Sequence, residues 1–203
     1  MTQLRFFLDL DGTLADTDAL NREAYRRVGV EVPPNAAGLS YREWLGDLVG
    51  IGDVERVHTA KQVWYGILLG DVDPHTLALP PTRLARTLLY GDARRSATVS
   101  CLTAASHECA RTLLRRLGLS VPVKPQLTYD ARRVILSRAM SVAKHRGTGS
   151  VVYVDDMGST VERLTEDVPG LRLLHYTGQT YEQLRAELAD VLGELITREL
   201  KTA

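Results

Sequence analysis

The stretch from Leu4 to Leu14 constrains the fold more than any other part of the sequence. It opens with a short apolar run rich in aromatic residues, which is typical of a buried strand. Two carboxylates two residues apart, Asp9 and Asp11, follow that run, and Gly12 comes next. We expect the backbone to turn at Gly12, because a residue without a Cβ adopts unusual dihedral angles at little cost. The sequence therefore predicts two acids at the open end of a strand.

Two carboxylates held this close repel each other, and each raises the pKa of the other. A hard divalent cation between them removes that cost, and oxygen ligands of this kind suit Mg²⁺. Asp9 and Asp11 are therefore candidate magnesium ligands.

The rest of the sequence alternates predicted strands with predicted helices. Apolar runs at 97–103, 151–154 and 171–175 indicate strands, and 121–129 is extended in character. We expect Ser106 and Asp130 to cap two of the helices between them, and Thr180 with Gln183 to form a capping box at the start of the last helix. Such alternation predicts an α/β fold with a doubly wound, mostly parallel sheet.

The segment 15–91 differs from this pattern, because it has helical periodicity and no convincing strand. We expect it to be a helical insertion, the cap, and the core to comprise 1–14 and 92–203. In doubly wound sheets, sites lie beyond the carboxyl ends of the strands. Asp9, Thr103 and the pair Asp155–Asp156 each end a predicted strand, so they are expected to converge on one crevice.

The sequence Asp-Leu-Asp-Gly-Thr at 9–13 resembles the first motif of the haloacid dehalogenase (HAD) superfamily in its phosphatase form, Asp-x-Asp-Gly-Thr. The resemblance implies a Rossmann-like core with a small helical cap inserted after that motif. It also implies that Asp9 is a nucleophile that forms an aspartyl-phosphate and that Asp11 is the general acid and base. Mg²⁺ would be bound by the Asp9 side chain and the Asp11 carbonyl oxygen.

Further matches follow in the same order. Thr103 resembles the second motif, a hydroxyl that holds the transferring phosphoryl group beside a helix N-terminus. Asp155–Asp156 resembles the fourth motif in its Asp-Asp variant, with Asp156 at the metal-ligand position and Asp155 beside it. The third motif, a cation that steadies Asp9 and the phosphate, has three candidates. We slightly favour Arg132 over Lys124, and Arg133 comes third.

The resemblance implies a Mg²⁺-dependent phosphomonoester hydrolase, and the cap favours a small substrate such as a sugar phosphate or a nucleotide. The alternatives are a phosphomutase of the β-phosphoglucomutase type, a phosphatase for nucleic-acid ends, and a non-catalytic binding protein. Thr13 favours hydrolysis, because mutase relatives often have Val there. The cap residues that would choose the substrate match no motif.

Composition narrows the partners and the location. Lys plus Arg and Asp plus Glu are 25 each among 203 residues, so the net charge is zero. General attraction to nucleic acid, other than to a phosphorylated end, or to anionic membranes is therefore not expected. Cys101 and Cys109 fit as small core residues. We expect a cytoplasmic protein without signal peptide or membrane span, and the sequence leaves its oligomeric state open.

Overall fold

The structure, a computed structural model, describes residues 4–36, 41–91, 94, 97–145 and 149–192. The chain divides into two compact units, one with Met1–Asp16 and Ala78–Ala203 and the other with Thr17–Leu77. None of the helices in the described ranges is long and apolar enough to cross a membrane.

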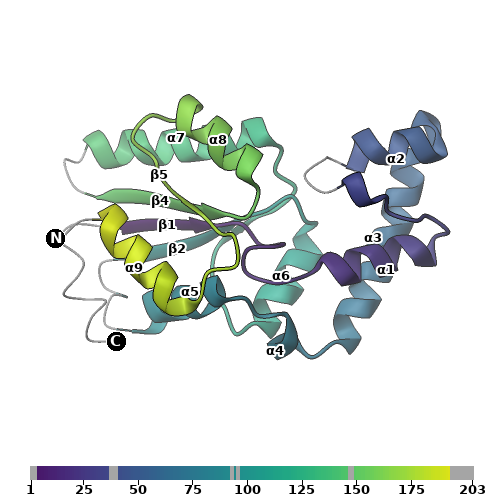
Figure 1. Cartoon of the computed structure of the whole chain (residues 1–203), viewed down its shortest axis with the longest axis horizontal. Helices are drawn as coiled ribbons and strands as arrows, with labels where there is room; N and C mark the ends of the chain where they lie inside the picture. The colour runs from purple at the N-terminus through teal and green to yellow at the C-terminus, as the bar shows by residue number, and fades with distance from the viewer. Residues whose placement is uncertain (1–3, 37–40, 92–93, 95–96, 146–148, 193–203) are drawn as a thin grey trace. The chain divides into compact units, whose positions relative to one another are not determined.

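The first unit, the core, contains a five-stranded parallel sheet of order β3-β2-β1-β4-β5 (Figure 1). The predicted α/β class with a parallel sheet is therefore confirmed. The central strand is β1, in which Leu8 pairs with Cys101 of β2 and with Val154 of β4. This register brings the ends of β1, β2 and β4 to one edge of the sheet. The strands are β1 (Leu4–Leu8), β2 (Ala97–Leu102), β3 (Val123–Lys124), β4 (Ser150–Asp155) and β5 (Arg172–His175).

Helices cover both faces of this sheet, as its alternating sequence predicts. Figure 1 shows α7 and α8 on one face, with α5 and α9 on the other. Both cysteines are buried free thiols, in agreement with their expected place in the core. The core helices are α5 (Pro80–Tyr90), α6 (His107–Arg116), α7 (Tyr129–His145), α8 (Gly158–Asp167) and α9 (Tyr181–Leu192).

The helix caps are those predicted from the sequence, with one exception. The Ser106 hydroxyl accepts a hydrogen bond from the Cys109 N–H, and Thr180 and Gln183 form the reciprocal capping box. Asp130, however, does not begin α7. The helix starts one residue earlier, and the Thr128 hydroxyl accepts the Ala131 N–H. The extended segment predicted at 121–129 contains only the two-residue strand β3.

The second unit is helical, and the structure contains no strand within its described residues. Its core contains Tyr25 and Trp44, whose rings meet edge to face at 4.8 Å. Lys61 is buried beside them and donates a 2.5 Å hydrogen bond to Asn21 Oδ1. The unit comprises α1 (Asp18–Arg27), η1 (Pro34–Ala36), α2 (Tyr41–Val49), η2 (Ile51–Asp53), α3 (Val54–Asp71) and α4 (Pro74–Leu77).

The helical unit is shorter than the expected insertion at 15–91, because α5 belongs to the core. The apolar face of α5 is fully buried there, through Leu84, Ala85 and Leu88. Thr82 Oγ1 also donates to the carbonyl of Leu14 at 2.6 Å. The chain leaves and re-enters the core at adjacent points, since Ala15 and Ala78 form an antiparallel bridge.

Candidate active site

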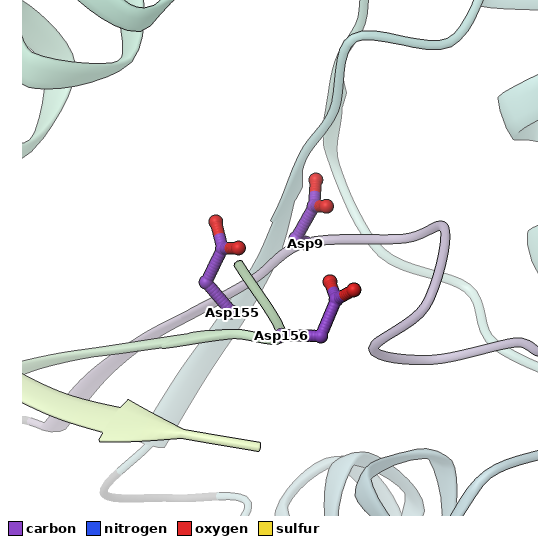
Figure 2. Close-up of side chains that lie close together, drawn as sticks. All are labelled: Asp9, Asp155 and Asp156. Atoms are coloured by element: carbon purple, nitrogen blue, oxygen red, sulfur yellow. The ribbon is translucent and has the colours of Figure 1, made fainter. Parts of the chain in front are cut away.

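Three carboxylates gather where β1 and β4 end. Each of Asp9, Asp155 and Asp156 offers an oxygen, and these oxygens all lie within 4.8 Å of one another. Figure 2 shows Asp9 on the segment that continues β1, and the other two acids side by side at the end of the neighbouring strand β4. The Asp9 N–H donates to the Val154 carbonyl at 3.0 Å, which fixes Asp9 against β4.

Gly12 makes this close approach possible. Its φ is +77°, a left-handed conformation that favours glycine. A Cβ at this position would lie only 2.2 Å from Oδ2 of Asp156. Both the backbone angle and the available space therefore require glycine in the loop after β1.

Thr13 joins the same loop to Asp156. The fully buried Thr13 hydroxyl donates to Asp156 Oδ1 and accepts the Asp156 N–H, both at 3.0 Å. These two bonds fix both the backbone and the side chain of Asp156. The structure therefore gives Thr13 a role in holding Asp156, and the expectation that it favours hydrolysis stays a prediction.

Arg132 is the buried cation of the site. Its Nη2 lies 3.3 Å from Asp9 Oδ1, and its Nη1 lies 2.6 Å from Asp155 Oδ2. Nη1 also donates to the hydroxyl of Tyr153 at 2.5 Å, and that hydroxyl donates to Asp155 Oδ2. Arg132 therefore links Asp9, directly after β1, to Asp155, the last residue of β4.

The two acids at the end of β4 have different surroundings. Asp155 is fully buried, and both of its oxygens accept hydrogen bonds. Oδ2 accepts from Arg132 and from Tyr153, and Oδ1 accepts from the Met157 N–H at 2.8 Å. Asp156 is partly buried and contacts the loop of Gly12 and Thr13. Protein donors thus bond to both oxygens of Asp155, whereas Asp156 accepts from Thr13 at Oδ1 and is more exposed.

Burial and like charges make the group costly without a cation. Burial raises the pKa of Asp9 well above its ordinary value, Arg132 lowers it, and Asp155, Asp11 and Asp156 raise it further. Burial and the charge of Asp155 also raise the pKa of Asp156. A divalent cation with oxygen ligands would relieve this repulsion, so the donor set fits Mg²⁺.

The other predicted site residues lie at different distances from these acids. Asp11 is partly buried, and its charge acts on Asp9. Thr103 is buried directly after β2, and its hydroxyl accepts the Ala105 N–H at 3.0 Å. Lys124 is exposed on β3. In the sheet, β3 is two strands from β1, a separation of about 10 Å between the strand backbones. Arg133 forms ion pairs with Asp130 at 3.7 Å and with Asp167 at 3.9 Å.

Sequence reasoning missed Tyr153 and the structural role of Thr13. Tyr153 is the only polar side chain in the apolar run 151–154, and a buried tyrosine hydroxyl needs a partner. That single hydroxyl could have pointed to the site, because the side chain lies two residues before Asp155 and shares its face of the strand.

No family model matches the sequence, and no curated protein matches it. Similar folds are found among solved structures. A protein from Thermotoga maritima described as a β-phosphoglucomutase is 23% identical, with a TM-score of 0.56, and the alignment covers 95% of this chain and all of that one. A HAD-superfamily hydrolase of subfamily IA from Geobacter sulfurreducens is 18% identical, with a TM-score of 0.58 and coverage of 94% and 97%.

The structure of CbbY from Rhodobacter sphaeroides in complex with xylulose-(1,5)bisphosphate is 17% identical. Its TM-score is 0.63, and the alignment covers 90% of this chain and 89% of CbbY. At these identities the similarity establishes the fold: the chain has the α/β fold of HAD-superfamily hydrolases, as the motif at 9–13 predicts.

Proposed function

We propose that this chain, with its HAD-type fold, is a Mg²⁺-dependent phosphomonoester hydrolase with Asp9 as nucleophile. One observation carries the proposal: the Asp9 carboxylate is buried at the end of the central strand, beside Asp155, Asp156 and the Arg132 guanidinium. A carboxylate so placed can attack phosphorus and form an aspartyl-phosphate.

Each neighbour has a role in this proposal. Asp9, Asp156 and the Asp11 carbonyl oxygen would hold Mg²⁺, which when bound would neutralise charge on the phosphoryl oxygens. Asp155 would mainly anchor Arg132, because both of its oxygens already accept hydrogen bonds. Arg132 would steady Asp9 and bind phosphoryl oxygens.

Asp11 would protonate the leaving oxygen in the first step and then take a proton from the water that attacks the aspartyl-phosphate. The Thr103 hydroxyl, directly after β2, would hold the phosphoryl group. We further propose that the unit Thr17–Leu77 is a cap that favours small substrates such as sugar phosphates or nucleotides. Lys124 remains the alternative phosphate ligand.

The first test is a Mg²⁺-dependent assay with an aryl phosphate, comparing the wild type with Asp9→Asn. We expect turnover to fall at least about 1,000-fold in the variant, because an amide is a poor nucleophile. Asp16→Asn, an exposed acid in the same loop, is the matched control and should keep wild-type turnover. Equal turnover by wild type and Asp9→Asn would refute the nucleophile assignment.

A second assay separates hydrolysis from the mutase alternative, which the similarity to the protein described as a β-phosphoglucomutase raises. Sugar monophosphates, nucleotides and a ketose bisphosphate would be incubated with the protein, and both phosphate release and isomer formation would be followed. Hydrolysis predicts stoichiometric phosphate release, whereas isomer formation without phosphate release would identify a mutase.

A further inference from the structure

Between Arg56 and Asp71, helix α3 has an exposed face without charged side chains. Val63 is 62% exposed and Ile67 49% exposed, and both lie on this face. Four of the six large hydrophobic side chains exposed in the described residues belong to the helical unit, namely Leu48, Ile51, Val63 and Ile67. The face itself comprises Thr59, Ala60, Val63, Gly66, Ile67 and Gly70, all exposed.

The spacing of this face is that of a helix–helix seam. Ala60, Val63, Ile67 and Gly70 follow one another at intervals of three and four residues, the repeat that packs one helix along another. The opposite side of α3 already packs inside the helical unit, through buried residues such as Val57 and Leu69. Helix α3 therefore has one apolar side that is buried and a second that is exposed.

The backbone of α3 does not require its two exposed glycines. A Cβ at Gly66 or Gly70 would meet no atom within 4 Å, and neither residue has a left-handed φ. Glycine inside a helix costs stability relative to alanine. Small residues on a helix surface do, however, allow a second helix to approach closely, so these positions fit packing against another molecule.

The charges at the two ends of this face indicate which molecule packs against it. Arg56 lies on the same face at the start of α3, where its guanidinium is exposed beside Asp53. Asp71 is exposed at the other end, at the helix C-terminus. We propose that α3 packs antiparallel against α3 of a second copy of this chain, with Val63 of each copy close to Val63 and Gly66 of the other and Ile67 close to the partner's Ala60. In that arrangement each Arg56 approaches an Asp71 and the negative end of the partner helix.

This proposal does not depend on the proposed function. The contact between two helices would bury about 1,200 Å² of surface or less, which is the range of weak interfaces. We therefore expect a dissociation constant of about 10–500 μM, measured by sedimentation equilibrium of the full chain from about 5 to about 500 μM. Ile67→Glu should weaken the dimer at least about tenfold, whereas Ile51→Glu, the matched control at a 90% exposed position, should not.

Two further sets of variants test the role of the glycines and the direction of the helix pair. Gly66→Ala and Gly70→Ala should each raise the unfolding midpoint of the dilute protein by about 2 °C and yet weaken the dimer. Arg56→Asp and Asp71→Arg should each weaken the dimer, and the double variant should restore it, as antiparallel pairing requires.

A protein that stays monomeric at the highest concentration would overturn the proposal, and so would a dimer that survives Ile67→Glu. A monomer that Ile67→Glu destabilises would show that the face is covered by the same chain, and would also overturn it. Failure of the charge-swapped double variant to restore the dimer would exclude the antiparallel arrangement.

Discussion

Gly12 is the residue whose replacement should show most directly how tightly the site is assembled. In Gly12→Ala, the new methyl carbon would collide with Oδ2 of Asp156, and alanine would also have to adopt a left-handed conformation. We expect a loss of about 2–4 kcal/mol in the free energy of unfolding, measured with urea, and at least about 100-fold lower turnover.

Gly29→Ala provides the control for this substitution. Gly29 has nearly the same φ, +79°, but a Cβ there would meet nothing within 4 Å. It should therefore cost only the backbone strain, about 1–2 kcal/mol, without loss of turnover. Equal effects of the two substitutions would show that the contact with Asp156 is unimportant.

Tyr153 is predicted to position Arg132 through its hydroxyl. Burial raises the pKa of this hydroxyl well above 10.0, so it keeps its proton and donates to Asp155. Tyr153→Phe removes the hydroxyl that bonds to both Arg132 and Asp155 and leaves only their direct ion pair, so we expect turnover to fall about tenfold, while the free energy of unfolding falls by about 1–2 kcal/mol.

Tyr129→Phe is the matched variant, because it removes a 2.8 Å hydrogen bond from a tyrosine to Asp167 on the surface. Steady-state kinetics of both variants should show reduced turnover for Tyr153→Phe alone. The positioning role would be wrong if the turnover of Tyr153→Phe matched that of Tyr129→Phe.

The helices and strands show which structural features local sequence patterns can predict. The alternation of strands and helices along the chain and the caps at Ser106 and Thr180 follow from periodicity and from side chains that bond to nearby backbone, both of which are local properties. The packing partner of α5 cannot be predicted from such local properties. Its stripe of Leu84, Ala85 and Leu88 predicts a buried face, but the pattern is the same whether the face packs on the core or in the insertion.

The same limit applies to the candidate site. The rule that strand ends share one edge predicts that Asp9, Asp155 and Asp156 meet, because it needs only the strand assignments. The choice between Lys124 and Arg132 could not be made in this way. It depends on where α7 begins and on how its first turn faces β4, and the observed cap, Thr128, lies two residues before the expected cap, Asp130.

Helix α3 is also predicted to make the helical unit sensitive to acid. The ring nitrogens of His58 form hydrogen bonds of 3.1 Å with the Tyr25 hydroxyl and 3.0 Å with the Gln62 side chain. Its ring stacks on that of Tyr41, with 3.6 Å between the ring centroids. Burial, aided by the charge of Lys61, lowers the pKa of His58 to about 4.

Because the unfolded chain protonates this histidine near pH 6.5 and the folded chain only near pH 4, stability should be lost as pH falls through that window. Allowing for partial solvent exposure, we expect a loss of about 1–2 kcal/mol. Thermal unfolding from pH 7 to pH 4.5 would measure it. His58→Gln should weaken the pH dependence, and His75→Gln, at an exposed position, should preserve it.

At the scale of the whole molecule, the helical unit is predicted to be removable. Ala15 and Ala78 form a bridge inside the core, and the Leu79 N–H donates to the Leu14 carbonyl at 3.0 Å, so the chain is already closed at the insertion point. Replacing 17–77 with a short Gly-Ser linker should leave a core that unfolds cooperatively, as followed by circular dichroism.

A longer deletion, of 17–91, tests the boundary between the two units. It also removes α5, whose buried leucines cover one face of the sheet, and we expect it to prevent cooperative folding. Two deletion variants that fold equally well would place the boundary at 91 instead of Leu77.

The central position of β1 has a consequence for biosynthesis. This strand leaves the ribosome well before its two neighbours in the sheet, which begin only at Ala97 and Ser150. Until they are made, an apolar segment has both hydrogen-bonding edges open, which is a hazard for nascent chains. Another 147 residues must therefore be translated after Asp9 before Asp156 exists beside it.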